Sequence, residues 1–142
     1  MNNKKVWITG ETFAQQYLTK LGYKIIGTNV KGANAEIDIV AICPKKVLIK
    51  ELTQEYKSGQ VLESSFLAEK KNTVDTLVFV EVKARSTAEF GLPQEAVTKT
   101  KQLHIKRAAE WFIKSGKYHD MPVRFDIIAI LGDKLEHFKC AF

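Results

Sequence analysis

Segment 77–83, Leu-Val-Phe-Val-Glu-Val-Lys, restricts the fold more than any other part of this sequence, because it reads as an apolar strand that carries two charges. Side chains alternate between the two faces of a strand, so Glu81 and Lys83 share one face while the three valines occupy the other. A charged face on so apolar a strand must be solvated, paired or bound to a cation, since burying an uncompensated charge is costly. The segment therefore predicts a strand that contributes to a functional site.

A second strand-like segment, 35–42, strengthens this interpretation because it carries acids at alternate positions, Glu36 and Asp38. Two neighbouring strands presenting Asp38, Glu81 and Lys83 toward one cleft would provide hard oxygen ligands for a divalent cation beside a positive group. Metal-dependent phosphodiesterases need this combination. The alternative is a salt-bridged network on an exposed sheet face.

Composition favours one domain over residues 1–142 and an anionic partner. A chain of 142 residues with 45% hydrophobic content can bury one core, and its formal net charge of +6 favours a partner such as nucleic acid. The two cysteines and three histidines show no metal-ligand spacing, which argues against structural zinc. No segment has the length and apolarity of a signal peptide or membrane span, so we expect a cytoplasmic protein with no membrane partner.

The first half of the chain predicts a helix, a hairpin and then a segment whose structure the sequence does not decide. Thr9 is placed to cap a helix over 10–21 that Gly22 ends, with Glu11 in the first turn, where helix-dipole pairing is the alternative to a catalytic role. Strands near 23–29 and 35–42 form a hairpin through the turn 31–34. Segment 44–76 leaves three alternatives: a hairpin extension, short helices or a mobile loop.

The second half predicts a long helix over 94–114 and strands over 123–130 and 134–139. Lys101 and His104 follow the apolar stripe of the helix, which indicates that part of its inward face meets a polar group; extension of Lys101 to solvent is the alternative. Trp111 and Phe112 are expected in the core; base stacking is the alternative. The order α-β-β-(insert)-β-α-β-β predicts an α/β fold in which helices flank a mixed sheet.

Several separate motifs in this order resemble the YraN-like family of uncharacterised bacterial proteins, within the PD-(D/E)XK restriction-endonuclease-like superfamily that includes archaeal Holliday junction resolvases. Two features depart from the family pattern: Ala35 replaces the usual glycine, and segment 44–76 is longer than the family connection. The motifs are Gly10-Glu11 with Ala14 and Leu18, Gly22-Tyr23, Asn29, Glu36-Ile37-Asp38, residues 79–85, Gly91, Glu95-Ala96-Val97, Lys101, Ala108 and Arg124-Phe125-Asp126.

The resemblance implies a restriction-endonuclease-like core and a site for Mg²⁺ or Mn²⁺. Asp38 and Glu81 would ligate the cation together with the Val82 carbonyl, and Glu11 would bind it directly or through water. Lys83 would orient or help deprotonate the attacking water. Glu36 would support the ligands or pair with Lys83. Arg124 and Asp126 match the family without an assigned role; as alternate residues of one strand they pair either with each other or with groups on neighbouring strands.

We therefore expect a metal-dependent endonuclease that hydrolyses DNA phosphodiester bonds, with branched or structured DNA as the substrate class. The alternative is a noncatalytic module that keeps the fold and binds nucleic acid or a protein partner. Resolvases act as dimers, so a homodimer is a further expectation. Five basic residues are candidate phosphate contacts, with plain solvation as the alternative: Arg85, Lys99, Lys101, Lys106 and Arg107.

Overall fold

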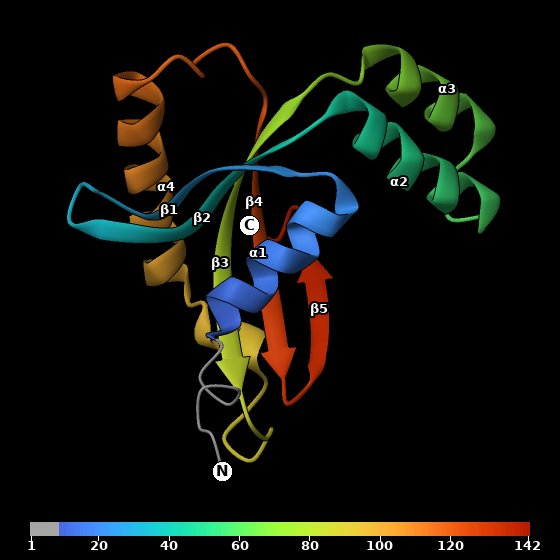
Figure 1. The fold of residues 1–142 in the computed structure, drawn as a ribbon. Helices are drawn as coiled ribbons and strands as arrows, with labels where there is room; N and C mark the ends of the chain where they lie inside the picture. The colour runs from blue at the N-terminus through green and yellow to red at the C-terminus, as the bar shows by residue number, and fades with distance from the viewer. Residues whose placement is uncertain (1–8) are drawn as a thin grey trace.

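The computed structural model describes residues 9–142, whose strands form one five-stranded sheet in the order β1-β2-β3-β4-β5 (Figure 1). Strands β3 and β4 run parallel, and the other neighbouring pairs run antiparallel. The predicted α/β class is confirmed: helices flank a mixed sheet. In chain order the elements are α1 (Gly10–Leu21), β1 (Lys24–Gly32), β2 (Ala35–Cys43), α2 (Lys45–Lys57), α3 (Glu63–Asn72), β3 (Thr76–Arg85), the 3₁₀ turn η2 (Pro93–Ala96), α4 (Lys99–Ser115), β4 (Val123–Leu131) and β5 (Lys134–Phe138).

Helix α1 has the predicted bounds, and its start lies directly against β3. The Thr9 hydroxyl accepts a hydrogen bond from the Thr12 amide, and Gly22 ends the helix with φ +101°. A Cβ added at Gly10 would lie 2.9 Å from the Ala84 Cβ, so only glycine allows this close approach of helix to strand. The first turn of α1, which includes Glu11, is therefore held beside the end of β3.

The sheet is buried on both faces. One cluster joins α1 to alternate residues of β3, including Val78, Val80 and Val82. The other joins α4 to the opposite row of β3, which includes Leu77 and Phe79. Because side chains alternate along a strand, Glu81 continues the Leu77–Phe79 row and faces the α4 side of the sheet.

Strands β2 and β3 separate next to the two acids that the sequence analysis singled out. Their pairing runs from Cys43 opposite Thr76 to Ile39 opposite Val80. One step further this register places Asp38 opposite Glu81, and beyond that point β2 pairs with β1 alone. The β1–β2 hairpin then leaves β3 and crosses α4 (Figure 1). This divergence, called the strand fork below, opens the sheet at Asp38.

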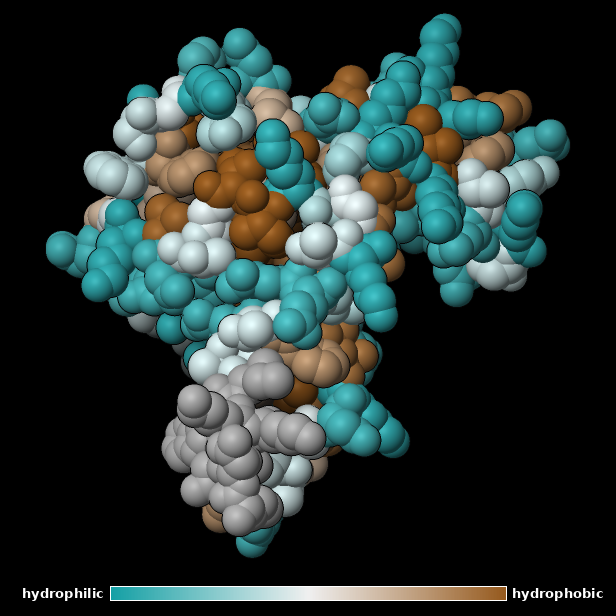
Figure 2. Space-filling view, in the orientation of Figure 1, coloured by the Kyte–Doolittle hydropathy of each residue, from teal (hydrophilic) through white to brown (hydrophobic). Residues whose placement is uncertain are grey.

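Segment 44–76, for which the sequence left three alternatives, forms the short helices α2 and α3. They make an arm that projects beyond the sheet and is held together by stacking of Tyr56 on Phe66, whose ring centroids are 4.6 Å apart (Figure 1). No residue of α3 is buried. Leu62 and Leu67 remain exposed, and Figure 2 shows hydrophobic residues among mainly hydrophilic ones on this arm.

The predicted long helix begins later than expected. Residues 93–96 form η2, and α4 starts at Lys99 because the Thr98 hydroxyl accepts from the Lys101 amide and caps the helix there. The prediction that His104 follows the inward stripe was wrong, since it is exposed. No helix among residues 9–142 has both the length and the apolar character needed to cross a membrane.

Phe112 packs edge-on against Phe79, as a core residue should. The prediction that Trp111 is also a core residue was wrong, because 50% of its surface is exposed. The two residues are adjacent on α4 and therefore point about 100° apart around the helix. Phe112 faces the sheet, whereas Trp111 lies against the β1–β2 hairpin, where Gly32 leaves room for the indole.

Candidate active site

Asp38 is fixed at the strand fork by the backbone of β3. Its Oδ2 accepts a hydrogen bond from the Val82 amide over 2.7 Å. The side-chain carboxylate thus bonds the β3 backbone at the point where backbone pairing between β2 and β3 ends. The bond also holds the side chain of Asp38 next to Glu81, the residue it faces in the strand register.

Glu81 is a buried acid without a compensating partner. Only 3% of its surface is exposed, and its Oε2 makes no hydrogen bond. Burial raises the pKa of Glu81 to about 8, and the adjacent carboxyl of Asp38 adds to the rise through a hydrogen bond and its charge. A carboxyl held this way favours either a proton or a cation at its free oxygen.

Glu11 reaches the same group from α1. Burial raises its pKa, followed by the charge of Asp38 and a hydrogen bond with it. Asn29, in register opposite Asp38, connects a further acid: with its amide nitrogen turned toward the carboxylates, it donates to Glu11 Oε2 and Glu36 Oε1, each at 3.0 Å. The structure thus joins four acids in one chain of contacts, which we call the acidic centre: Glu36, Glu11, Asp38 and Glu81.

Asn29 is the residue of the acidic centre to which the sequence analysis gave no role. Its backbone is left-handed, with φ +49°, a conformation that asparagine tolerates better than most residues. The signal that could have identified it was an asparagine inside a strand-like segment that predicts regular pairing. The link to Glu11 could not be read from the sequence, because it joins β1 to the first turn of α1.

Two partly buried lysines act on Glu81 through their charge. Lys101 and Lys83 each lower the pKa of Glu81 and so oppose the effect of burial. Within residues 9–142, no ion pair shorter than 4.0 Å joins either lysine to a carboxylate. The carboxylates contact one another instead, so the alternative of a salt-bridged network on an exposed sheet face does not describe this site.

The donor set of the acidic centre fits a hard divalent cation. Carboxylate oxygens are the ligands that Mg²⁺ and Mn²⁺ prefer, and the unpartnered Glu81 Oε2 offers a free donor. In the described part of the chain no three His, Cys, Asp or Glu side chains are already grouped around one point. Asp38 and Glu81 would have to separate around a cation, which would also remove their mutual repulsion.

The remaining basic candidates lie in different surroundings. The Arg85 guanidinium donates to the Phe90 carbonyl over 2.8 Å and so holds the loop after β3. The Lys106 ammonium lies 5.7 Å from the centre of the Phe125 ring, away from the acidic centre. Lys99 and Arg107 are exposed on α4. Of the five, Lys101 is the one that the structure brings to the acids.

Arg124 and Asp126 form a second polar group, on the α1 face of the sheet. Asp126 accepts two hydrogen bonds from the Arg124 guanidinium, at 2.8 and 2.7 Å, and lies 2.7 Å from His137 Nε2. Arg124 also donates to the Tyr23 hydroxyl. This pairing is one of the alternatives left open by the sequence, and its burial marks a structural role.

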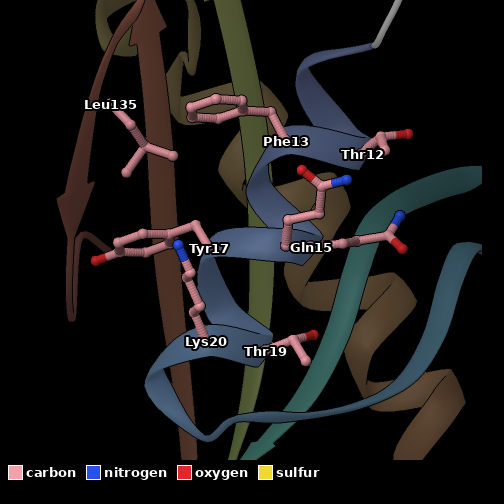
Figure 3. Close-up of a pocket in the computed structure, with 8 residues that line it drawn as sticks. Thr12, Phe13, Gln15, Tyr17, Thr19, Lys20 and Leu135 are labelled. Carbon is pink, nitrogen blue, oxygen red and sulfur yellow. The ribbon is translucent and has the colours of Figure 1, made fainter.

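An open groove of about 860 Å³ lies between α1 and β5. Figure 3 shows Phe13 and Tyr17 pointing from α1 toward Leu135. Among residues 9–142, its lining includes one lysine, Lys20, and no acid, so these residues do not supply the carboxylates that metal-dependent hydrolysis needs.

The raised pKa of Glu81 predicts an unusual pH dependence of stability in metal-free protein. The folded chain holds a proton on Glu81 up to about pH 8, whereas the unfolded chain loses it near 4.5, so stability falls as pH rises between these values. Glutamine has no such proton to lose. Between about pH 5 and about pH 9, the difference in unfolding free energy between Glu81→Gln and the native protein should therefore shift by about 2–4 kcal/mol in favour of the variant. Urea unfolding with chelator measures this, with exposed Glu89→Gln as the control; equal effects at both pH values would contradict it.

Comparison with known proteins gives matches along almost the whole chain. The model described as "Uncharacterised protein family UPF0102" matches residues 10–130, a span that contains the acidic centre. The UPF0102 protein of Caldicellulosiruptor saccharolyticus is 34% identical, over 92% of this chain and 85% of the relative. The corresponding protein of Geobacter sulfurreducens is 36% identical, over 99% of this chain and 91% of the relative.

Proposed function

The chain belongs to the uncharacterised protein family UPF0102, as its resemblance to the YraN-like proteins predicted, and we propose that it is a metal-dependent endonuclease that hydrolyses phosphodiester bonds in DNA. The observation that carries the proposal is the state of Glu81. This acid is buried, its Oε2 has no partner, and it lies against Asp38 at the strand fork. Such a cluster of carboxylates is unfavourable unless a proton or a cation separates them.

Asp38 and Glu81 would hold a Mg²⁺ or Mn²⁺ ion, with the Val82 carbonyl as a third donor and Glu11 as a direct or water-mediated one. When bound, the cation would lower the pKa of a coordinated water and stabilise negative charge on the phosphate oxygens. Asp38 is suited to its part because the Val82 amide already fixes its orientation. Asn29 and Glu36 would keep Glu11 turned toward the centre.

Lys83 would act on the reacting groups rather than on the ligands. It lies two residues beyond Glu81 on the same face of β3 and acts on that acid through its charge. Its ammonium form would orient the attacking water and stabilise the phosphate charge by donating hydrogen bonds to the phosphate oxygens, whereas only its neutral amine form would take a proton from that water. Lys101, which approaches Glu81 from α4, would hold the neighbouring phosphate.

One observation favours the alternative of a noncatalytic module that binds nucleic acid or a protein. Asp38 Oδ2 is committed to the Val82 amide, and no three potential ligands among residues 9–142 are preassembled. In that case the buried carboxyl of Glu81 would keep its proton at neutral pH and the acidic centre would remain a structural element.

A cleavage assay tests the proposal. Labelled four-way junction, flap, single-stranded and linear duplex DNA would be incubated with the protein and Mg²⁺, Mn²⁺ or chelator. We expect cutting that requires a divalent cation and favours branched or flapped DNA. Asp38→Asn is the matched control, since asparagine keeps an acceptor for the Val82 amide while removing the charge that a cation needs.

Cutting by both proteins would indicate a contaminating nuclease and contradict the proposal. DNA binding without cutting by the native chain would favour the noncatalytic module. Equilibrium binding is therefore recorded in parallel, at one fixed salt concentration, because phosphate contacts make affinity depend strongly on salt.

A further inference from the structure

Trp111 is a large aromatic side chain whose exposure the fold does not require. Half of its surface is exposed, although neighbouring Phe112 and Ile113 pack into the core cluster under α4. The indole is also held in place: a Cβ added at Gly32 would come within 2.6 Å of Trp111 Cε3. Ala33 and Asn34, with φ of +50° and +62°, form the tight turn next to this glycine. The ring therefore rests on the turn of the hairpin and still presents surface to solvent.

The exposed part of Trp111 opens into a groove that adjoins the acidic centre. The groove, about 550 Å³, lies between α4 and the tip of the β1–β2 hairpin. It is lined by Trp111, small residues of the hairpin, Lys31 and Glu36. Glu36 is bonded through Asn29 to Glu11, so one end of the groove belongs to the acidic centre itself.

Positive charge surrounds the indole on α4. Arg107 lies four residues before Trp111 and Lys114 three residues after it, so all three share one side of the helix. Both cations are exposed. Lys31 on the hairpin lines the same groove, and Lys101 of α4 acts on Glu81 through its charge, so cations lie both at the groove and at the acids.

We propose that Trp111 is a stacking platform for an unpaired base of the DNA strand that enters the acidic centre. This inference rests on the proposed function and assigns its substrate class: DNA with unstacked nucleotides beside the scissile phosphate, such as a flap or a splayed end. Bases inside a duplex are covered by their neighbours and cannot stack on a protein side chain, whereas single-stranded bases can. The surrounding cations would hold the phosphates on either side.

A DNA strand suits the groove better than an apolar peptide. The hairpin residues 32–35 beside the indole are glycine, two alanines and an asparagine, which leave room for a planar ring but offer little apolar surface. Lysine and arginine around the ring match phosphates, and an exposed aromatic residue between cations is the usual arrangement of single-strand binding surfaces. Glu36 also lines the groove, and its negative charge would be compensated by the cation bound at the acidic centre.

Tryptophan fluorescence tests the inference without cleavage. The chain has two tryptophans, of which Trp7 lies outside the described residues, so Trp7→Phe leaves Trp111 as the single reporter. In chelator, a flap or single-stranded oligonucleotide should quench this signal, and a blunt duplex of equal length should not. Trp111→Leu, which keeps apolar contact with Gly32, should weaken binding of the flap about tenfold.

Trp111→Phe should retain most of the affinity, because phenylalanine keeps an aromatic face. Leu103→Ala is the matched control: it removes an exposed apolar side chain from α4 that does not line the groove. Melting temperatures of all variants confirm that they remain folded. If Trp111→Leu unfolds, quenching in the Trp7→Phe protein still decides the matter, since position 111 is then native.

The two proposals fail separately. Metal-dependent cutting with unquenched Trp111, or with flap affinity unchanged in Trp111→Leu, would overturn the stacking platform and leave the nuclease intact. Quenching by the flap without any cutting would overturn the nuclease and support the platform on a noncatalytic protein. Absence of both binding and cutting would overturn both.

Discussion

Glu81→Gln is expected to reduce the proposed metal-dependent DNA cleavage by at least about 10³-fold, because the substitution removes the carboxylate that would hold the cation at the centre of the site. The protein should stay folded, since the glutamine replaces a buried acid whose Oε2 has no partner to lose. If the site holds a cation, Mg²⁺ or Mn²⁺ should raise the melting temperature of the native chain, and the same substitution should abolish that rise.

Lys83→Met separates chemistry from cation binding. It should lower cleavage by about 10²–10³-fold through loss of the group proposed to orient the attacking water, yet keep the metal-induced rise in melting temperature expected of the native chain. Lys57→Met, at the far end of α2, controls for the loss of one positive charge. Equal metal-induced shifts in native protein and Glu81→Gln, or full activity in Lys83→Met, would contradict the assigned roles.

Asp126→Ala is expected to cost about 3–5 kcal/mol of unfolding free energy, because it leaves the buried Arg124 guanidinium without its carboxylate. Asp126 is fully buried, and it also accepts a hydrogen bond from the Cys140 amide. Asp120→Ala is the control: that acid also faces a histidine but is 96% exposed, so its loss should change stability by less than about 0.5 kcal/mol. Urea unfolding at neutral pH measures both.

The pairing of Asp126 with Arg124 also predicts how the stability of the fold changes in acid. Burial opposes ionisation of Asp126, but hydrogen bonds from His137 and Arg124 and their charges outweigh it, and its pKa is lowered. A lowered pKa stabilises the fold above the unfolded value of 3.8, and this contribution is lost as pH falls through the folded value. Asp126→Asn should flatten this part of the acid unfolding curve; an unchanged curve would assign acid sensitivity to other groups.

Local signals predicted the elements that depend on neighbours in the chain. Helix α1 has its expected bounds because Thr9 and Gly22 satisfy its two ends, and the alternation of β3 correctly placed Glu81 and Lys83 on one face. The start of α4 was misplaced because the residues from Pro93 to Thr98 also read as helical. Their backbone instead forms a 3₁₀ turn, after which Thr98 caps the helix.

Trp111 shows where pattern reading fails. Its large apolar side chain predicts burial, but burial depends on which side of α4 meets the sheet and which meets the hairpin. The register of the hairpin brings Gly32 under the indole, and no local sequence signal encodes this contact. The prediction that Lys101 meets a polar group was better founded, since a charge within an apolar stripe requires a partner or solvent, and Glu81 lies near it.

The sequence by itself determined the α/β class, the order of elements and the identity of the candidate acids, because periodicity, capping and motif order are local properties of the chain. Tertiary structure alone decided that Glu11, Asp38 and Glu81 meet at the strand fork and that Asn29 joins Glu36 to them. It also decided that Glu81 is buried and that its Oε2 has no hydrogen-bond partner. Burial and charge proximity arise between residues distant in the sequence, and they set both the pKa of Glu81 and its suitability for a cation.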